Sequence, residues 1–436
     1  MTAPQTSQLK KVLKPIHLWA IAVGLVISGE YFGWNYGWGV SGTVGFLIST
    51  LFVTVMYLTF IFSFTELTTA IPHAGGPFAY ARRAFGWWGG FVAGYATLVE
   101  FLVTPTAIAF ALGSYAHFLY PEVQVLHIAF LCYFIFVGIN LLGIKESAIF
   151  SLVVTILAIG ELLIYIGIVA PSFSISTFMT DPMPFGWYGI FAALPFAIWF
   201  YLAIEGVAMV AEETYDSNTT IFKGYSYGIA TLVALALGVM IFTGGAAPWT
   251  SLSTIDYPLP AVLGIVLGKD NSLTKIFASL GLFGLIASFH GTIIGYSRQI
   301  FALARANYLP PILASVNKRF QTPHWALISG GVVGCIALML GTTDQIIILA
   351  ALGAVVMYII SMLSLFALRI KEPEMTRPFK VPLYPWFPII ALVLSVVCLI
   401  AIIWFNFMLS VCFFTGLVIL LGLFSRFKNN CDNRMI

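Results

Sequence analysis

The chain is poor in charge. Only 8% of its 436 residues are Asp, Glu, Lys or Arg, whereas 60% are hydrophobic. Soluble domains carry about 25% charged residues, so this composition excludes an ordinary water-soluble fold. The formal net charge of +3 is too small to predict binding to nucleic acid, and no long basic run adds to it.

Cysteine is also scarce, and no two of the five cysteines lie close together in the sequence. Four of them lie within apolar segments, so we predict neither a disulfide framework nor a metal site. No glycine-rich loop leads into a helix with a phosphate-binding lysine, which argues against an ATP-driven pump. With no catalytic constellation present, we predict a protein that is not an enzyme and needs no cofactor. The cysteines are Cys132, Cys335, Cys398, Cys412 and Cys431.

Long apolar runs dominate the chain. Runs of about 20 apolar residues, the length that crosses a bilayer, recur from end to end. The N-terminus is polar through Pro15 and lacks a small-residue cleavage site, so we expect the first apolar segment to be retained. The sequence therefore predicts an all-α polytopic membrane protein with about twelve spans. The expected spans are 16–41, 43–71, 88–119, 124–143, 147–170, 187–211, 225–247, 272–304, 324–341, 344–368, 386–405 and 408–425.

The basic residues predict the orientation. If the N-terminus is cytoplasmic, all of the 20 lysines and arginines except Lys269 and Lys275 fall on the cytoplasmic side. We therefore predict a multi-pass protein of the plasma membrane, or of the inner membrane if bacterial, with both termini in the cytoplasm. The predicted units are a tail (1–15), a first five-helix unit (16–170), a second five-helix unit (187–368), two C-terminal helices (386–425) and a tail (426–436).

The first apolar segment contains residues that weaken a spanning helix. Residues 27–33 read Ile-Ser-Gly-Glu-Tyr-Phe-Gly. Each glycine costs a helix roughly 1 kcal/mol relative to alanine, and an acidic residue at mid-membrane costs about 2.5–3.5 kcal/mol. Intramembrane acids usually face a protein interior or a watery cavity and mark functional sites. We therefore predict a broken helix here, with Glu30 lining a binding site.

A second segment combines the same features. Residues 195–206 include Trp199, Tyr201, Glu205 and Gly206 within the sixth expected span. Spans one and six lead the two five-span units, and matching interruptions in corresponding positions indicate a transporter with inverted repeats. The aromatic rings near both breaks offer faces to an organic ammonium, a contact that contributes up to about 2 kcal/mol when desolvated.

Three stretches resemble one family of transporters. Residues 66–80 read Glu-Leu-Thr-Thr-Ala-Ile-Pro-His-Ala-Gly-Gly-Pro-Phe-Ala-Tyr; the second stretch is 195–213 and the third is 297–323. These stretches resemble the amino acid–polyamine–organocation transporter superfamily. The resemblance implies a LeuT-like 5+5 inverted repeat with discontinuous helices 1 and 6, usually followed by two more helices. It also implies transport of small amines or amino acids by alternating access.

The first span departs from the usual pattern of that superfamily. Ser28 and Glu30 stand where the family has glycines, which offer backbone N–H groups to a substrate carboxylate. Glu30 would repel a carboxylate and suits an ammonium group. Residues 28–35 most resemble the ethanolamine permease branch, which implies import of ethanolamine or a closely related small amine. An amino acid or polyamine carrier of the same superfamily is the alternative within the class, and a ligand-binding membrane sensor without turnover is the alternative outside it.

The coupling ion stays open between proton and sodium. Some family members carry a lysine in span 5, but residues 158–161 read Ala-Ile-Gly-Glu. Buried acids are then the available titrating groups. If Glu30 and Glu205 lie near one site, like-charge repulsion with desolvation favours a proton on one of the two carboxyl groups. We therefore expect binding of a cationic amine to be linked to proton loss. The candidate coupling residues are Glu205, Glu30, Glu100, Glu161 and His290.

Each candidate also has a structural alternative. Glu30 can serve as a structural carboxylate that accepts hydrogen bonds from backbone N–H groups freed at the break, and His290 can be a hydrogen-bonded core histidine. Glu66 belongs to the family-like motif and is expected to act in packing or gating. The predicted substrate-binding residues are Ile27, Ser28, Gly29, Glu30, Tyr31, Trp199, Tyr201 and Glu205.

Overall fold

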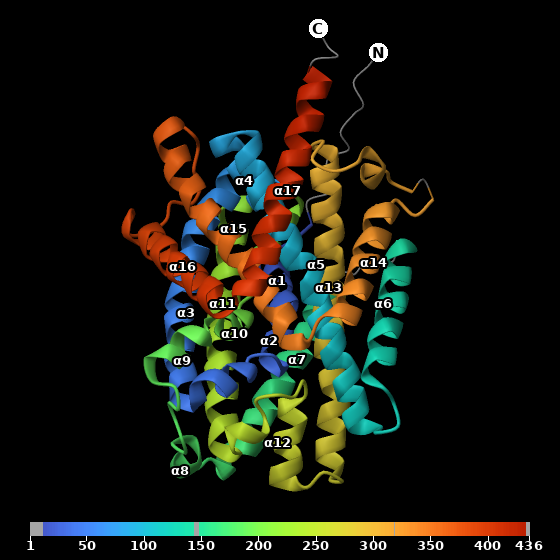
Figure 1. Cartoon of the computed structure of the whole chain (residues 1–436), viewed down its shortest axis with the longest axis vertical. Coiled ribbons are helices and arrows are strands. Elements are labelled where there is room, and N and C mark those ends of the chain that lie inside the picture. Colours follow the sequence, from blue (N-terminus) through green and yellow to red (C-terminus); the bar gives the residue numbers. More distant parts are fainter. Residues whose placement is uncertain (1–11, 144–147, 318, 433–436) are drawn as a thin grey trace.

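The computed structural model describes residues 12–143, 148–317 and 319–432. Within these ranges the regular elements are helices. One isolated β-bridge pairs Leu13 with Thr214. Figure 1 shows most helices running along the long axis of the molecule as a bundle. The predicted all-α polytopic fold is confirmed. Residues 1–11 and 433–436 of the predicted tails, and the expected start of span five at 147, lie outside the described residues.

Long apolar helices account for most of the expected spans. In the described part of the chain, nine helical segments are long and apolar enough to cross a membrane. The shorter apolar helices α1 (Pro15–Val26), α6 (Val125–Leu141) and α14 (His324–Leu340) match the remaining expected spans. The other spanning helices include α5 (Trp87–Leu119), α7 (Ala148–Val169), α11 (Ser217–Ala246), α13 (Ser272–Arg305), α15 (Thr343–Lys371), α16 (Trp386–Phe405) and α17 (Phe407–Asp432).

The helical segment α3 (Tyr36–Ala70) contains the boundary expected between spans one and two. Gly42 interrupts it with φ of 69°, a left-handed conformation that glycine adopts without strain. A Cβ atom at Gly42 would also lie 2.6 Å from the carbonyl oxygen of Pro182. Two helices therefore meet at Gly42, which is the residue left between the two expected spans.

The first expected span is interrupted, as its glycines and glutamate predict. Helix α1 ends at Val26, and a short helix α2 (Ser28–Tyr31) follows. Phe32 is then extended, and Gly33 has φ of 90° before α3 begins at Tyr36. Ile27, between α1 and α2, keeps right-handed helical dihedral angles, so the backbone leaves helical geometry only after Tyr31.

The sixth expected span is interrupted as well. Helices α9 (Gly186–Ala192) and α10 (Leu194–Trp199) lead to a turn that ends at Ala203. Ala203 has φ of 78°, a left-handed conformation that is costly for a residue with a Cβ atom. The chain continues as a 3₁₀ helix, η2 (Ile204–Glu213), so the second half of this span keeps a different hydrogen-bond pattern from the first.

The two interruptions touch each other inside the bundle. The indole N–H of Trp199 donates to the carbonyl oxygen of Phe32 at 3.0 Å, and the two rings lie edge to face with centroids 5.6 Å apart. A Cβ atom at Gly29 would lie 2.5 Å from the carbonyl oxygen of Trp199. The close approach of these backbones therefore requires glycine at position 29.

The ends of the bundle separate the connecting elements. Helix α4 (Pro77–Phe85) and the C-terminal end of α17 lie at one end, whereas α8 (Ile175–Phe178) and α12 (Pro258–Leu267) lie at the opposite end (Figure 1). This division agrees with the expected placement of the loops that contain α4 and α12 on opposite sides of the membrane. The distribution of the basic residues predicts which end faces the cytoplasm.

Candidate functional site

Glu30 lies in α2, within the interruption of the first span, and is completely buried. Its backbone N–H donates to the carbonyl oxygen of Ile27 at 3.0 Å, but neither carboxylate oxygen has a hydrogen-bond partner among the described residues. The structure therefore lacks the backbone hydrogen bonds that the structural alternative for Glu30 requires. An unpaired buried carboxylate is costly, so this position favours a bound cation or a proton.

An aromatic side chain of the second interruption borders this carboxylate. Tyr201 is close enough to Glu30 to interact with it electrostatically, and its hydroxyl group pairs with that of Thr54 at 2.7 Å. The ring of Tyr57 lies 5.1 Å from the ring of Tyr201. Trp199, in contrast, uses its N–H to join the two breaks. Tyr201 thus borders the Glu30 carboxylate, while Trp199 fixes the backbone beside it.

Several backbone N–H groups of the first break already have partners. The N–H of Phe32 donates to the carbonyl oxygen of Ser28 at 3.3 Å, and the N–H of Gly33 donates to Oδ1 of Asn35 at 2.9 Å. These groups, together with the N–H of Glu30, are therefore engaged within the chain and do not face an anionic ligand in this structure.

Ser28 and Ile27 join the break to α13. The hydroxyl groups of Ser28 and Ser288 pair at 2.8 Å, and Ser288 also donates to the carbonyl oxygen of Leu25 at 2.6 Å. Ile27 is completely buried beside them. These contacts hold the end of α1 against α13, so the predicted residue Ser28 has a bonded hydroxyl group.

Glu205 lies in a separate cluster of carboxyl groups. The sequence predicts Glu30 as its acidic neighbour, but the structure places Glu100 of α5 against it instead, because Glu205 follows the left-handed turn at Ala203. The hydroxyl group of Tyr358 donates to Oε2 of Glu205 at 3.3 Å and pairs with the hydroxyl group of Tyr57 at 2.7 Å. Sequence reasoning missed these tyrosines; the only signal was a polar hydroxyl group in an otherwise apolar span.

Glu161 and His290 occupy other places. The hydroxyl group of Tyr31 donates to Oε2 of Glu161 at 2.8 Å, so α7 is joined to the first break. His290 lies on α13, and its ring is 5.9 Å from the ring of Phe136 on α6. Of the two, Glu161 contacts a predicted site residue.

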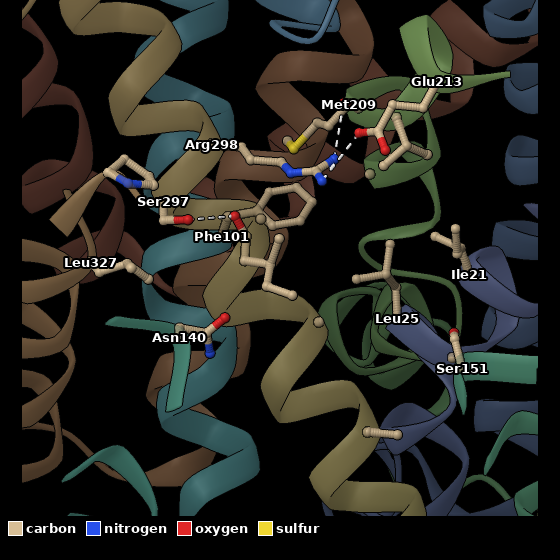
Figure 2. Close-up of a pocket in the computed structure, with 18 of the residues that line it drawn as sticks. Ile21, Leu25, Phe101, Asn140, Ser151, Met209, Glu213, Ser297, Arg298 and Leu327 are labelled. Atoms are coloured by element: carbon tan, nitrogen blue, oxygen red, sulfur yellow. Dashed lines mark hydrogen bonds and ion pairs between the residues drawn. The ribbon is translucent and has the colours of Figure 1, made fainter. Parts of the chain in front are cut away.

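A cavity of about 370 Å³ lies beside the breaks, between α1, η2 and α13 (Figure 2). Arg298 crosses one end of it, with Nη2 3.2 Å from Oε1 of Glu213 and Nη1 donating to the carbonyl oxygen of Met209 at 3.3 Å. The predicted site residues do not line this cavity. It stops at Leu25 and Gly206, which are close in sequence to Ile27 and Glu205. Sequence reasoning missed the cavity, although Arg298 belongs to the third family-like stretch.

The opposite side of the breaks is closed by the segment that contains α12. Nδ2 of Asn35 donates to the carbonyl oxygens of Leu252 and Ile255 at 2.6 and 2.8 Å. The carboxylate of Asp256 accepts hydrogen bonds from the hydroxyl groups of Tyr36 and Thr343 at 2.7 and 2.8 Å. Burial in this loop raises the pKa of Asp256 to about 6. The segment that contains α12 is therefore hydrogen-bonded to the starts of both α3 and α15.

The predicted role of Glu66 in packing agrees with its contacts. Its carboxylate forms a two-pronged ion pair with Arg369, at 2.9 and 2.6 Å, and lies 3.3 Å from Nε of Arg377. It also accepts the backbone N–H of Val381 at 2.8 Å. Across the described residues, no cluster of three or more His, Cys, Asp or Glu side chains is arranged to hold a metal ion.

An all-helical bundle in which two interrupted helices meet at buried carboxyl groups defines a membrane transporter of the permease class. The chain belongs to the amino acid permease family, whose sequence model matches residues 13–424. It is 28% identical to an uncharacterised transporter of Rhizobium meliloti over 91% of this chain and 86% of that protein. It is 22% identical to a branched-chain amino acid permease of Bacillus subtilis, over 91% and 89% of the two chains. It is 24% identical to a methylthioribose transporter of the same organism, over 89% and 87%.

Proposed function

We propose that this permease is a secondary transporter that imports a small amine without a carboxylate, with ethanolamine or a close relative as the substrate. The carrying observation is the completely buried Glu30 carboxylate, which has no hydrogen-bond partner in the described part of the chain. An ammonium group donates three hydrogen bonds and supplies the missing positive charge. Tyr201 and Tyr57 would border the organic part of such a ligand.

The state of the backbone supports the same substrate class. A substrate carboxylate would need free N–H groups at the first break, and those of Glu30, Phe32 and Gly33 already have partners. It would also meet the like charge of Glu30. The amino acid alternative rests on a different observation, the similarity to a branched-chain amino acid permease. A carboxylate-containing substrate would require the N–H groups to exchange partners.

The cavity provides a route for release. It extends from Leu25 and Gly206, beside the two breaks, to the Arg298–Glu213 ion pair, whereas the α12 segment closes the other side. With the orientation that the basic residues predict, the cavity faces the cytoplasm. The structure then corresponds to an inward-facing stage of alternating access, in which movement of Leu25 and its neighbours connects Glu30 with the cavity.

Uptake and competition in proteoliposomes test this proposal. We expect uptake of labelled ethanolamine, with unlabelled ethanolamine competing more strongly than serine, glycine or leucine. The amino acids share an ammonium group with ethanolamine, so the comparison isolates the effect of the carboxylate. Stronger competition by serine or leucine would contradict the amine proposal and support an amino acid as the substrate. Saturable binding without any uptake would instead support a sensor.

A further inference from the structure

Two buried carboxyl groups lie together away from Glu30. Glu100 of α5 and Glu205 of η2 are both completely buried and interact directly. Neither oxygen of Glu100, nor Oε1 of Glu205, has a hydrogen-bond partner among the described residues. No Lys, Arg or His in the same ranges forms an ion pair with either group. Two adjacent charged carboxylates without a cation or donor between them are strongly unfavourable.

One proton removes this conflict. A protonated carboxyl group donates its O–H to the neighbouring carboxylate, and paired carboxyl groups of this kind hold a proton between them. We propose that Glu100 and Glu205 form a proton-binding site that holds one shared proton and releases it during the transport cycle. This inference rests on the proposed transport function and identifies the proton as the coupling ion.

The groups around the pair leave no other source of positive charge in the described structure. Three tyrosines face Glu205: Tyr358 of α15 donates to its carboxylate, Tyr57 of α3 pairs with Tyr358, and Tyr225 of α11 donates to its backbone carbonyl oxygen at 3.4 Å. A tyrosine hydroxyl group is neutral at physiological pH and can both donate and accept a hydrogen bond. The tyrosines therefore orient the pair without neutralising it.

The two carboxyl groups belong to elements with different surroundings. Glu100 lies on α5 where α15 packs closely, because a Cβ atom at Gly353 would be 3.0 Å from the backbone nitrogen of Glu100. Glu205 lies on η2, and Gly206, Met209 and Glu213 of that helix line the cavity. A movement of η2 that reshapes the cavity would therefore draw Glu205 away from Glu100. Separation breaks the shared hydrogen bond, and a proton that Glu205 carries toward the cavity passes to water there, because solvation favours the charged carboxylate.

Infrared spectroscopy of the purified full chain tests the proton site without any substrate. The C=O stretch of a protonated carboxyl group is followed while the pH is raised, in wild type, Glu100→Gln, Glu205→Gln and the double variant. We expect each of the three variants to lose the same single carboxyl signal. The amide of either single variant still donates to the remaining carboxylate, which no longer needs a proton. Glu122→Gln, which alters a glutamate in an exposed loop, is the control and should keep the signal.

Three results would overturn the proposal: a wild type without the signal, a single variant that keeps it, or a double variant that loses two separate signals. Because the two single variants alter different helices, failure of one to fold leaves the other as the test. A second measurement follows ethanolamine accumulation in proteoliposomes under an imposed proton gradient. We expect accumulation in wild type and its loss in Glu205→Gln. If wild type does not transport ethanolamine but retains the infrared signal, the substrate proposal fails and the proton site stands.

Discussion

At the scale of single residues, the intramembrane acids differ in their partners. Glu66 is held by two arginines, and Glu161 accepts a hydrogen bond from Tyr31. Glu100 and Glu205 face each other, whereas the Glu30 carboxylate has no partner in the described chain. These differences support a structural role for Glu66 and agree with the proposed binding roles of the less satisfied acids.

Glu30→Gln should weaken binding of ethanolamine by about 1.5–3 kcal/mol, because the variant replaces a charge-assisted hydrogen bond with a neutral one. This corresponds to roughly a tenfold or greater increase in the dissociation constant. Calorimetric titration of the purified protein measures the change. Glu122→Gln, in an exposed loop, is the control and should bind like wild type. An unchanged dissociation constant in folded Glu30→Gln would remove Glu30 from the substrate site.

Asp256, at the closed end of the bundle, should make the stability of the protein depend on pH. Its pKa is raised from 3.8 to about 6 by burial, so the protonated form is favoured in the closed structure. The unfolded chain loses this proton near pH 3.8, and stability should therefore fall as pH rises from there to about 6 and then level off. Asp256→Asn should lack this part of the pH profile.

Melting temperatures measured across that range provide the test. The Asp256→Asn variant should gain stability relative to wild type between pH 4 and about 6, by up to about 3 kcal/mol, the equivalent of the raised pKa. Asp270→Asn, which alters an exposed acid of the same loop, should follow the wild-type profile. Parallel profiles of wild type and Asp256→Asn would show that Asp256 does not bind its proton in the closed structure.

At the scale of elements, contact between the two interruptions explains why both contain small or strained residues. α2 and α10 approach so closely that the carbonyl oxygen of Trp199 occupies the space of a Cβ atom at Gly29. The indole of Trp199 then bonds to the backbone of Phe32. The two broken helices therefore form one packed unit.

Gly29→Ala should destabilise the protein by about 1–3 kcal/mol, the usual cost of overpacking a tight site, because the added methyl group displaces the α10 backbone. Thermal unfolding in detergent measures this. Gly160→Ala on α7 is the matched control, because no atom outside its helix lies within 4 Å of the added Cβ. It should be neutral or stabilising by up to about 1 kcal/mol. Equal melting temperatures for the two variants would contradict the close approach.

The sequence predicts well the features of these elements that depend on residues close together in the chain. The spans follow from hydropathy, and both interruptions follow from glycine and glutamate within apolar runs. The pairing of Glu205 was predicted incorrectly, because its neighbour Glu100 lies 105 positions away in the sequence and no local pattern indicates their contact. Similarly, the cavity depends on the relative positions of α1, η2 and α13, which hydropathy does not specify.

At the scale of the whole molecule, the two ends of the bundle are in different states. The α12 segment is fastened to α3 and α15 at one end, and the cavity beside Arg298 and Glu213 lies toward the other. The proposed alternating-access cycle requires the opposite arrangement at another stage. Release of the Asp256 hydrogen bonds and closure around the Arg298–Glu213 ion pair would produce it.

The contact between Trp199 and Phe32 also has a consequence for biogenesis. The two residues are 167 positions apart, so Glu30 emerges from the ribosome long before its neighbours in the second break exist. At about 5–20 residues per second, the delay is roughly ten to thirty seconds. During that time the first span must enter the bilayer with an uncompensated acid, at a cost of about 2.5–3.5 kcal/mol. Protonation of Glu30, or shelter by the insertion machinery, would remove this cost for as long as the second break is still being synthesised.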